Sequence, residues 1–198
     1  RAIYIPFPQA VPSSYTIDNS LCLGLKPLVC AKCIEACEPK AIDPNMSEKI
    51  IEDDFGAIIV ATGCDVYPKE NIGEYGYGLI EDVIDSLQFE RILSSTGPTG
   101  GEIKRPSDQK SVGKIAFIQC AGSRDKNHLE YCSKVCCMYT AKHAILFKHR
   151  VPKGEAYVFY IDVRSAGKGY EEFYQRAQTE HNVVYIKSKP SKVYLNRR

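Results

Sequence analysis

The stretch "FIQCAGSRDKNHLEYCSKVCCMY" (117–139) begins as a nucleotide-binding unit begins, with an apolar strand that runs into a turn of small residues and then into a helix. In such units a G-x-G-x-x-G pattern gives a tight turn and lets the pyrophosphate approach the backbone. The turn here keeps only Gly122 of that pattern, and cysteines stand around it. Nicotinamide binding at this turn is therefore not expected, and sulfur chemistry is.

The segments around this stretch predict a parallel α/β sheet. Strands alternate with helices, and the helices are long enough to form crossover connections. The expected strands are 114–119, 156–163 and 183–187, and the expected helices are about 128–149 and 168–181. Residues 114–198 are thus predicted to form half of a doubly wound domain.

The cysteines of this half domain are spaced C-x11-C-x3-C-C. On the predicted helix, Cys132 and Cys136 lie one turn apart on the same face, with Cys137 beside them. Cys120 ends the preceding strand, at the edge where open α/β sheets bind ligands. The four thiols can converge, so the spacing favours a metal cluster. Structural or redox-active thiols are the alternative, because Cys is small and easily buried.

A first set of cysteines lies near the N-terminus, with the spacing C-x7-C-x2-C-x3-C followed by Glu38 and Pro39. Its members are Cys22, Cys30, Cys33 and Cys37. The second half of this run matches the ferredoxin pattern that binds a [4Fe-4S] cluster. Structural zinc is the alternative, but zinc sites usually pair two C-x2-C units, and the second unit is absent.

Two arrangements of this first set are open. The four thiols could close one cluster alone, or Cys37 could bind a different cluster from the other three, as in two-cluster ferredoxins. Residues 18–44 are too few and too polar to form a hydrophobic core. A metal is therefore the simplest means of holding this segment together.

Composition narrows the possible functions. A formal charge of +2 without a long Lys/Arg run gives no support for nucleic-acid binding. Prolines interrupt the N-terminal segment where a signal peptide would be apolar, and no stretch approaches the ~18 apolar residues of a membrane span. We therefore expect a cytoplasmic protein, in which nine cysteines indicate metal or redox chemistry rather than disulfides. Because the chain opens on Arg1 rather than Met, we expect it to be part of something larger.

The segment "KIIEDDFGAIIVATGC" (49–64) predicts a short strand, an acidic turn and a second strand. The second strand, 57–61, is continuously apolar, so it is expected to be buried on both faces. It ends at Thr62 and Gly63. Cys64 follows, and we interpret it as a small buried residue rather than a redox partner.

One amphipathic helix is expected near 86–94, with Leu87, Ile92 and Leu93 facing inward and Glu90 and Arg91 exposed. The residues that follow it, 95–113, are rich in Gly, Pro and Ser. This composition predicts a long surface connection and a domain boundary.

With both cysteine sets taken together, the chain resembles the A subunit of the heterodisulfide reductases, which is the flavin and iron–sulfur subunit of methanogens, sulfate reducers and related anaerobes. The resemblance spans nearly the whole chain, and its most specific part is the C-x11-C-x3-C-C set. The matching segments are "AIYIPFPQAVP" (2–12), the cysteine run 22–37, "GAIIVATG" (56–63), "LQFERILSSTGPTGGEIKRPSD" (87–108), "IAFIQCAGSRD" (115–125), "YCSKVCCMYTAKHA" (131–144) and "VFYIDVRSAGKGYEEFYQRA" (158–177).

The resemblance implies a fragment of a thioredoxin-reductase-like flavoprotein with two dinucleotide-binding domains and part of an inserted ferredoxin-like module. Residues 1–44 would belong to the ferredoxin-like module, 45–113 to the FAD-binding domain and a linker, and 114–198 to the half domain with the second cysteine set. The flavin would lie against Ala61, Thr62 and Gly63. The chain lacks the FAD fingerprint G-x-G-x-x-G, so FAD is expected with the full-length protein of the family.

The resemblance also implies a role in electron transfer. The eight cysteines of the two sets would hold [4Fe-4S] clusters that relay electrons between FAD and partner proteins. Those partners would be the B and C subunits of heterodisulfide reductase, ferredoxin, and a hydrogenase or other electron-donor subunit. The family reduces the disulfide of coenzyme M and coenzyme B and is linked to flavin-based electron bifurcation. Its disulfide-cleaving site lies on the B subunit, so no catalytic residue is expected here.

Two other functions stay open on the residues alone. One is a zinc-stabilised interaction module without a redox role. The other is a nicotinamide-dependent disulfide reductase that uses Cys136 with Cys137, or Cys132 with Cys136, as a dithiol. In the cluster interpretation, Arg124 and Lys134 are expected to screen the negative charge of the thiolates.

Overall fold

The computed structural model describes residues 2–6, 14–24 and 29–196. The chain divides into two compact units, residues 1–62 and 63–198, which are taken separately below. Most of the resembling segment 2–12 lies outside the described residues. None of the helices within the described ranges is long and apolar enough to cross a membrane.

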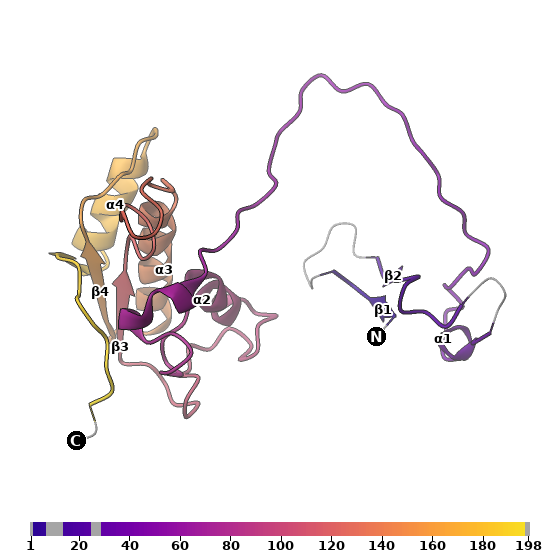
Figure 1. Cartoon of the computed structure of the whole chain (residues 1–198), viewed down its shortest axis with the longest axis horizontal. Coiled ribbons are helices and arrows are strands. Elements are labelled where there is room, and N and C mark those ends of the chain that lie inside the picture. The colour runs from indigo at the N-terminus through magenta and orange to yellow at the C-terminus, as the bar shows by residue number, and fades with distance from the viewer. Residues whose placement is uncertain (1, 7–13, 25–28, 197–198) are drawn as a thin grey trace. The chain divides into compact units, whose positions relative to one another are not determined.

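The first unit holds little regular structure. Strands β1 (Ile3–Tyr4) and β2 (Thr16–Ile17) pair antiparallel, with Ile3 opposite Ile17, and the short helix α1 spans Lys32–Glu35 (Figure 1). No side chain in the described part of this unit is buried. The expectation that this segment forms no hydrophobic core of its own is thus confirmed.

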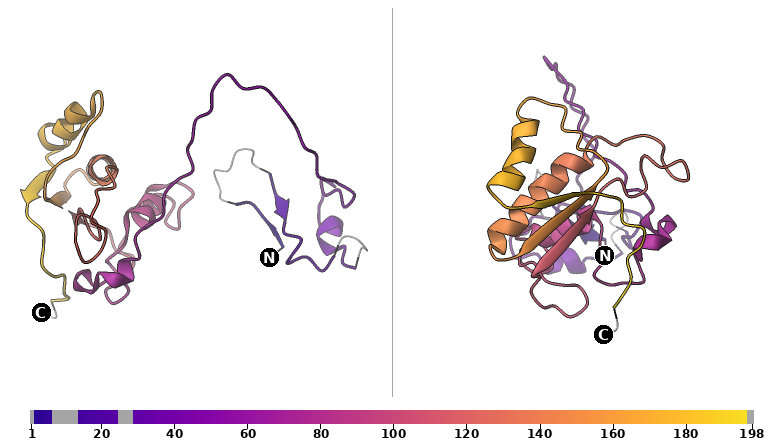
Figure 2. Two further views of the ribbon diagram at one scale, coloured as in Figure 1. Left: turned by 45° about the horizontal axis from the view of Figure 1, so that its top comes forward. Right: turned by 90° about the vertical axis from the view of Figure 1, so that its left-hand side faces the viewer.

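The second unit is built on a parallel sheet of three strands in the order β3-β4-β5. These strands are β3 (Lys114–Ile118), β4 (Glu155–Tyr160) and β5 (Val184–Lys187). Helix α3 (Cys136–Arg150) connects the first two strands and α4 (Tyr170–Thr179) the last two. The helices pack beside each other, and α3 also packs on β4, as Figure 2 shows. The predicted strand-helix-strand-helix-strand order and the parallel sheet are confirmed.

Small side chains allow α3 to lie close on the sheet. Ala141 and Ala144 of α3 and Ala156 of β4 are fully buried, and they belong to one core together with Phe147 and Val158. Alanine at these positions lets helix and strand backbones approach, and the close packing fixes how α3 sits over the carboxyl ends of the strands. The core therefore positions the cysteines at the start of α3.

The amphipathic helix predicted near 86–94 is present as α2 (Ser86–Leu93). Asp85 caps it in a reciprocal capping box with Gln88, which satisfies free N–H groups of the first turn. Its buried side chains are Phe89, Ile92 and Leu93. Leu87, expected to face inward, is 54% exposed. The buried residues are spaced i, i+3, i+4, and a residue two positions before Phe89 points away from that stripe.

The connection 95–113 is only partly a surface segment. Residues on both sides of Ile103 are exposed or half-buried, but Ile103 itself is 7% exposed and joins the core that holds α2 and α3. A backbone bridge between Lys104 and Ser111 closes the loop beyond it. The assignment of 45–113 to a flavin domain and its linker stays a prediction.

The strand predicted at 57–61 is wrong for this chain: residues 46–68 form no helix or strand, and Ile58 and Ile59 are 85% and 91% exposed. A strand that is buried on both faces needs a neighbouring strand on each edge and a layer on each face. No strand in the described residues pairs with this segment. The apolar run is therefore exposed and without regular structure at the end of the first compact unit.

The contact of α2 with α3 contains a buried histidine. His143 is 2% exposed, its ring packs edge-on against Phe89, and its Nε2 bonds to Glu90, which also pairs with Lys142. Burial lowers the pKa of His143, and the hydrogen bond to Glu90 only partly offsets this. Burial also acts on Glu90, but the bonds from Lys142 and His143 outweigh it and lower the pKa of the carboxyl.

This contact predicts a loss of stability in acid. His143 binds a proton more readily in the unfolded chain than in the folded chain, because its pKa is lowered in the folded state. The free energy of unfolding therefore falls as the pH decreases below about 6.5. Below about pH 4.5 protonation of Glu90 adds to the loss, because its folded pKa is also depressed. Chemical denaturation across pH 7.5–4 measures both steps. In His143→Gln the first step should shrink relative to the parent, and an unchanged profile would contradict the assignment.

Candidate metal centre

Three of the four cysteines in the C-x11-C-x3-C-C set come together at the carboxyl end of β3. Strand β3 ends at Ile118, and Cys120 lies two residues further along the chain. Cys136 and Cys137 are the first two residues of α3. Each of the three is at most 8% exposed. The thiol of Cys136 hydrogen-bonds with both Cys120 and Cys137. The pairing of a strand-end thiol with thiols of the helix, expected from the spacing, is thus present for these three.

Backbone conformation brings Cys120 into this cluster. Its φ is +55°, a left-handed conformation that a residue with a side chain rarely adopts. The turn reverses the chain at the end of β3 and leaves the side chain under the start of α3. Such strained residues persist only where the surrounding structure holds them, and they concentrate at functional sites.

The thiols differ in acidity because they share hydrogen bonds. The bond from Cys136 stabilises the thiolate of Cys120, and Arg124 adds to this, so the pKa of Cys120 falls to about 6 despite burial. Cys136 and the backbone N–H of Arg164 lower the pKa of Cys137 to about 6 in the same way. The pKa of Cys136 rises, because it donates to both neighbours and is buried. The shared hydrogen bonds thus favour the thiolate form of Cys120 and Cys137, which is the form that binds metals.

Cys137 is anchored to the ends of two strands. Its Sγ accepts from the backbone N–H of Arg164 at 3.3 Å. The same sulfur lies 3.9 Å from Oε1 of Gln119, after β3, and 3.9 Å from the carbonyl oxygen of Asp162, after β4. This thiol therefore sits at the meeting point of β3, β4 and α3.

Arg124 supplies the positive charge of the site. It pairs with Asp162 and also hydrogen-bonds to the sulfur of Cys120. The pairing holds the guanidinium beside the thiols. The predicted screening role of Arg124 is compatible with this placement and stays a prediction, as does that of Lys134.

Cys132 lies outside the helix, and the prediction that it shares a helical face with Cys136 is wrong. Helix α3 begins at Cys136, and Lys134, with φ +61°, prevents a continuous helix from 128. The Sγ of Cys132 accepts from the backbone N–H of Lys134 at 3.4 Å. The preceding residues form a loop instead, in which the side chain of Asp125 accepts from the backbone N–H of Asn127. Such local side-chain bonds compete with helix formation.

An aromatic residue from another segment covers this loop. The hydroxyl of Tyr67 lies 2.7 Å from Nδ1 of His128, and the two rings meet edge to face. The Tyr67 ring lies directly against Gly122: a Cβ added to that glycine would lie 2.5 Å from it. The only glycine that remains of the nucleotide fingerprint thus gives room to an aromatic ring. No local pattern indicates this contact, because Tyr67 is 55 positions away along the chain.

The first cysteine set lines a cavity of about 390 Å³ in the first unit. Cys22, Cys30 and Cys33 form part of its wall, together with apolar side chains that include Ile3, Ile17 and Leu21. Cys37 is not among the lining residues, and its Sγ instead accepts from the backbone N–H of Ala41 at 3.3 Å. Three of the four thiols of the first set thus share the wall of one cavity.

The predicted flavin-contacting residues are exposed. Ala61, Thr62 and Gly63 lie in the extended segment at the boundary between the two compact units. Gly63 has a φ of +78°, which turns the chain after the apolar run. Cys64, interpreted as a buried small residue, is exposed as well. This segment has no packing partner among the described residues that would bury it, so its flavin contact stays a prediction.

The thiol donor sets suit iron–sulfur ligation chemically, although the ligands do not surround a common point. Within residues 2–6, 14–24 and 29–196, no three His, Cys, Asp or Glu side chains are arranged as a metal site. In the second set Cys136 bonds with both Cys120 and Cys137, and in the first set three thiols face a cavity. Thiolates are soft ligands, and iron–sulfur clusters take such ligands.

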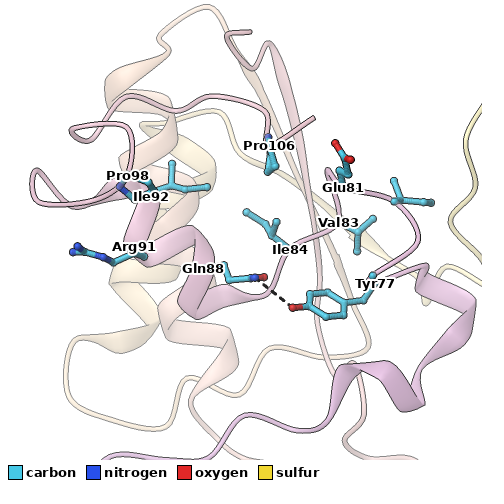
Figure 3. Close-up of a pocket in the computed structure, with 11 residues that line it drawn as sticks. Tyr77, Glu81, Val83, Ile84, Gln88, Arg91, Ile92, Pro98 and Pro106 are labelled. Carbon is cyan, nitrogen blue, oxygen red and sulfur yellow. Dashed lines mark hydrogen bonds between the residues drawn. The ribbon is translucent and has the colours of Figure 1, made fainter. Parts of the chain in front are cut away.

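A further hollow of about 440 Å³ lies beside α2 and contains no cysteine. Its wall is mostly apolar, and Figure 3 shows the hydroxyl of Tyr77 meeting the side-chain amide of Gln88 across it. The side chain of Arg91 also lines it. None of its lining residues belongs to the thiol sites.

Comparison with known proteins identifies the relatives of the chain. No family model matches it. It is 44% identical to the A subunit of the H(2):CoB-CoM heterodisulfide,ferredoxin reductase of Methanothermobacter marburgensis, over 99% of the chain and 29% of that protein. It is 45% identical to the iron-sulfur A subunit of the CoB--CoM heterodisulfide reductase of Methanocaldococcus jannaschii, over 96% of the chain and 28% of that protein.

A third relative is the A subunit of the Ferredoxin/F(420)H(2)-dependent CoB-CoM heterodisulfide reductase of Methanosarcina acetivorans, which is 45% identical over 98% of the chain and 24% of its own length. The chain therefore spans less than a third of each of these relatives. The resemblance carried by the cysteine spacing is confirmed by sequences that align along nearly the whole chain. The chain is homologous to a part of the A subunit of the heterodisulfide reductases, which are oxidoreductases.

Proposed function

We propose that this chain is an electron-transfer segment of a heterodisulfide reductase-type oxidoreductase and that its two cysteine sets hold [4Fe-4S] clusters. The observation that carries the proposal is the burial of Cys120, Cys136 and Cys137 at the carboxyl edge of a parallel sheet, with Cys136 bonded to the other two. The similarity to a relative named as an iron–sulfur subunit supports it. Thiolate-bound clusters accept and release single electrons, which suits a relay between a flavin and partner proteins.

In the second unit the ligands are Cys120, Cys136, Cys137 and, from the loop before α3, Cys132. The protein prepares this set in three ways. It buries Cys120, Cys136 and Cys137, lowers the pKa of Cys120 and Cys137 through hydrogen bonds and, for Cys120, the charge of Arg124, and fixes Cys137 with the N–H of Arg164. Hydrogen bonds to sulfur and neighbouring positive charge favour the more reduced state of a cluster.

In the first unit we favour the two-cluster arrangement. Cys22, Cys30 and Cys33 face one cavity and would bind one cluster, with the fourth ligand from outside the chain. Cys37 lies apart from that cavity and would ligate a different cluster, as the last cysteine of a ferredoxin run does. This choice between the two arrangements rests on which thiols share the cavity wall.

The flavin and the partners belong to the full-length protein. We propose that Ala61, Thr62 and Gly63 approach FAD there, when the apolar run 57–61 is covered by strands of a flavin domain. Its 85–91% exposed isoleucines support this, because such a run is stable only when buried. The proposed partners are the B and C subunits, ferredoxin and an electron-donating hydrogenase component, in a complex capable of electron bifurcation.

Metal analysis tests the proposal against its alternatives. The chain, purified without oxygen, should contain iron and acid-labile sulfide in equal amounts, about four of each per cluster. Zinc near one per chain without iron or sulfide would support the zinc-stabilised module and overturn the proposal. Nicotinamide-dependent reduction of a disulfide by metal-free protein would instead support the dithiol reductase.

A further inference from the structure

Three buried side-chain polar atoms in the described residues have no hydrogen-bond partner: Oη of Tyr75, Nε2 of Gln119 and Oη of Tyr185. All three atoms carry a hydrogen that can be donated. Buried donors are nearly always bonded in folded proteins, so each of the three requires an explanation. One of them, Gln119, lies beside a thiol of the second cysteine set.

Gln119 shows this most directly. It is 4% exposed, it precedes Cys120, and its Oε1 lies 3.9 Å from the sulfur of Cys137. In this contact the thiol of Cys137 donates to the amide oxygen, so the contact is a hydrogen bond only while Cys137 is protonated. A half-turn of the amide exchanges its oxygen and nitrogen within the same space and directs N–H toward the sulfur. The unpartnered Nε2 then gains an acceptor.

Tyr185 approaches the same thiol from β5. Its ring is held edge-on between Tyr160, with centroids 5.7 Å apart, and Tyr174, at 4.8 Å. The hydroxyl is buried, and burial is the main cause that raises the pKa of Tyr185. The charge of Cys137 is a further cause of that rise, which shows that this thiol lies within electrostatic reach.

Tyr75 ends the short 3₁₀ turn Gly73–Tyr75 and is 7% exposed. Burial raises the pKa of Tyr75, and the charge of Cys120 is a minor further cause. Among the described residues, Gln119 is thus the unpartnered donor in contact with a thiol, and Tyr185 is a second unpartnered donor that interacts with the same thiol through its charge.

We infer that Gln119 and Tyr185 are hydrogen-bond donors to the sulfur atoms of the group held by the second cysteine set, and that they raise its reduction potential. The inference rests on the proposed function and deepens it. Sulfur of a thiolate or sulfide accepts hydrogen bonds and carries more negative charge in the reduced state, so donors stabilise that state. The sulfur atoms would then be the hydrogen-bond acceptors that these buried donors lack in the protein alone.

The test compares Gln119→Leu and Tyr185→Phe with matched controls at exposed positions, Gln175→Leu and Tyr194→Phe. All four are made in a background in which the four cysteines of the first set are serine, so that only the second set contributes iron. The first set lies in the other compact unit, which leaves the second unit intact. The measurements are a redox titration followed by electron paramagnetic resonance and the couplings of exchangeable protons in ²H₂O.

Each donor variant should lower the ratio of reduced to oxidised cluster at a fixed potential about threefold to tenfold, where tenfold corresponds to about 59 mV for one electron. It should also lose one exchangeable-proton coupling, while the controls match the background. Iron and sulfide in the background with an unchanged potential and unchanged couplings in both variants would overturn the inference alone. Absence of iron and sulfide from the background would overturn the proposed function itself. If Gln119→Leu fails to fold, Tyr185→Phe, which removes only an oxygen atom, decides the outcome.

Discussion

Replacing Cys137 by serine is expected to remove one cluster, about four iron and four sulfide per chain, from anaerobically purified protein. Cys137 is the thiol most firmly placed in the structure: it is 5% exposed, contacts Cys136 and accepts the N–H of Arg164 at 3.3 Å. Serine keeps the size of the side chain but is a poor ligand for iron in an all-thiolate site. A packing role for Cys137 predicts full retention of iron, so retention would contradict the ligand role.

The matched control is Cys64→Ser. Cys64 belongs to neither cysteine set, and it is exposed, so its replacement should leave iron and sulfide unchanged. Cys132→Ser adds a sharper comparison, because Cys132 lies in the loop before α3 rather than beside the other three sulfurs. Loss of iron in Cys132→Ser equal to that in Cys137→Ser identifies Cys132 as the fourth ligand. Retention there, with loss in Cys137→Ser, would assign the fourth position to another group.

The parallel sheet and the convergence of Cys120 with Cys136 and Cys137 were predictable from the sequence alone. Alternation of apolar strands with long helices admits few topologies, and the carboxyl ends of parallel strands meet at one edge. The amphipathic pattern of residues 86–94 likewise predicted α2, although it placed Leu87 on the wrong face. These features depend on residues that lie close in the chain or on rules of chain connection that hold across folds.

The start of α3 was not predictable in the same way. Residues 128–135 have no glycine or proline to break a helix, and Cys132 and Cys136 have helical spacing. The loop is instead held by contacts that periodicity does not register, such as Tyr67 with His128 and Asp125 with Lys189. Tertiary contacts of this kind override local propensity.

The apolar run 57–61 failed for a different reason. Its composition predicts a strand that is buried on both faces. Such a strand forms only when neighbouring strands and covering layers are present, so the segment cannot adopt this structure alone. The chain supplies neither flanking strands nor covering layers among its described residues. The prediction of a buried strand was therefore conditional on neighbours that the run itself cannot specify.

Gly122→Ala is expected to destabilise the second unit by about 2–5 kcal/mol. Two costs add up: about 1–2 kcal/mol for placing a side chain at a left-handed φ of +75°, and about 1–3 kcal/mol for overpacking against Tyr67. The added Cβ would lie 2.5, 2.8 and 2.9 Å from three atoms of that ring, and the ring is held by its bond to His128. Thermal or chemical denaturation measures the loss.

Gly78→Ala separates the two costs, because Gly78 has nearly the same φ, +78°, and no atom within 4 Å of the added Cβ. It should lose only the conformational part, about 1–2 kcal/mol. Combining Gly122→Ala with Tyr67→Ala should recover the steric part, so that the double variant is more stable than the sum of the single losses predicts. Equal losses for Gly122→Ala and Gly78→Ala would show that the ring yields without cost. The expected excess instead measures the steric cost of a side chain at position 122 against the Tyr67 ring, and therefore how firmly that ring is held beside the turn after β3.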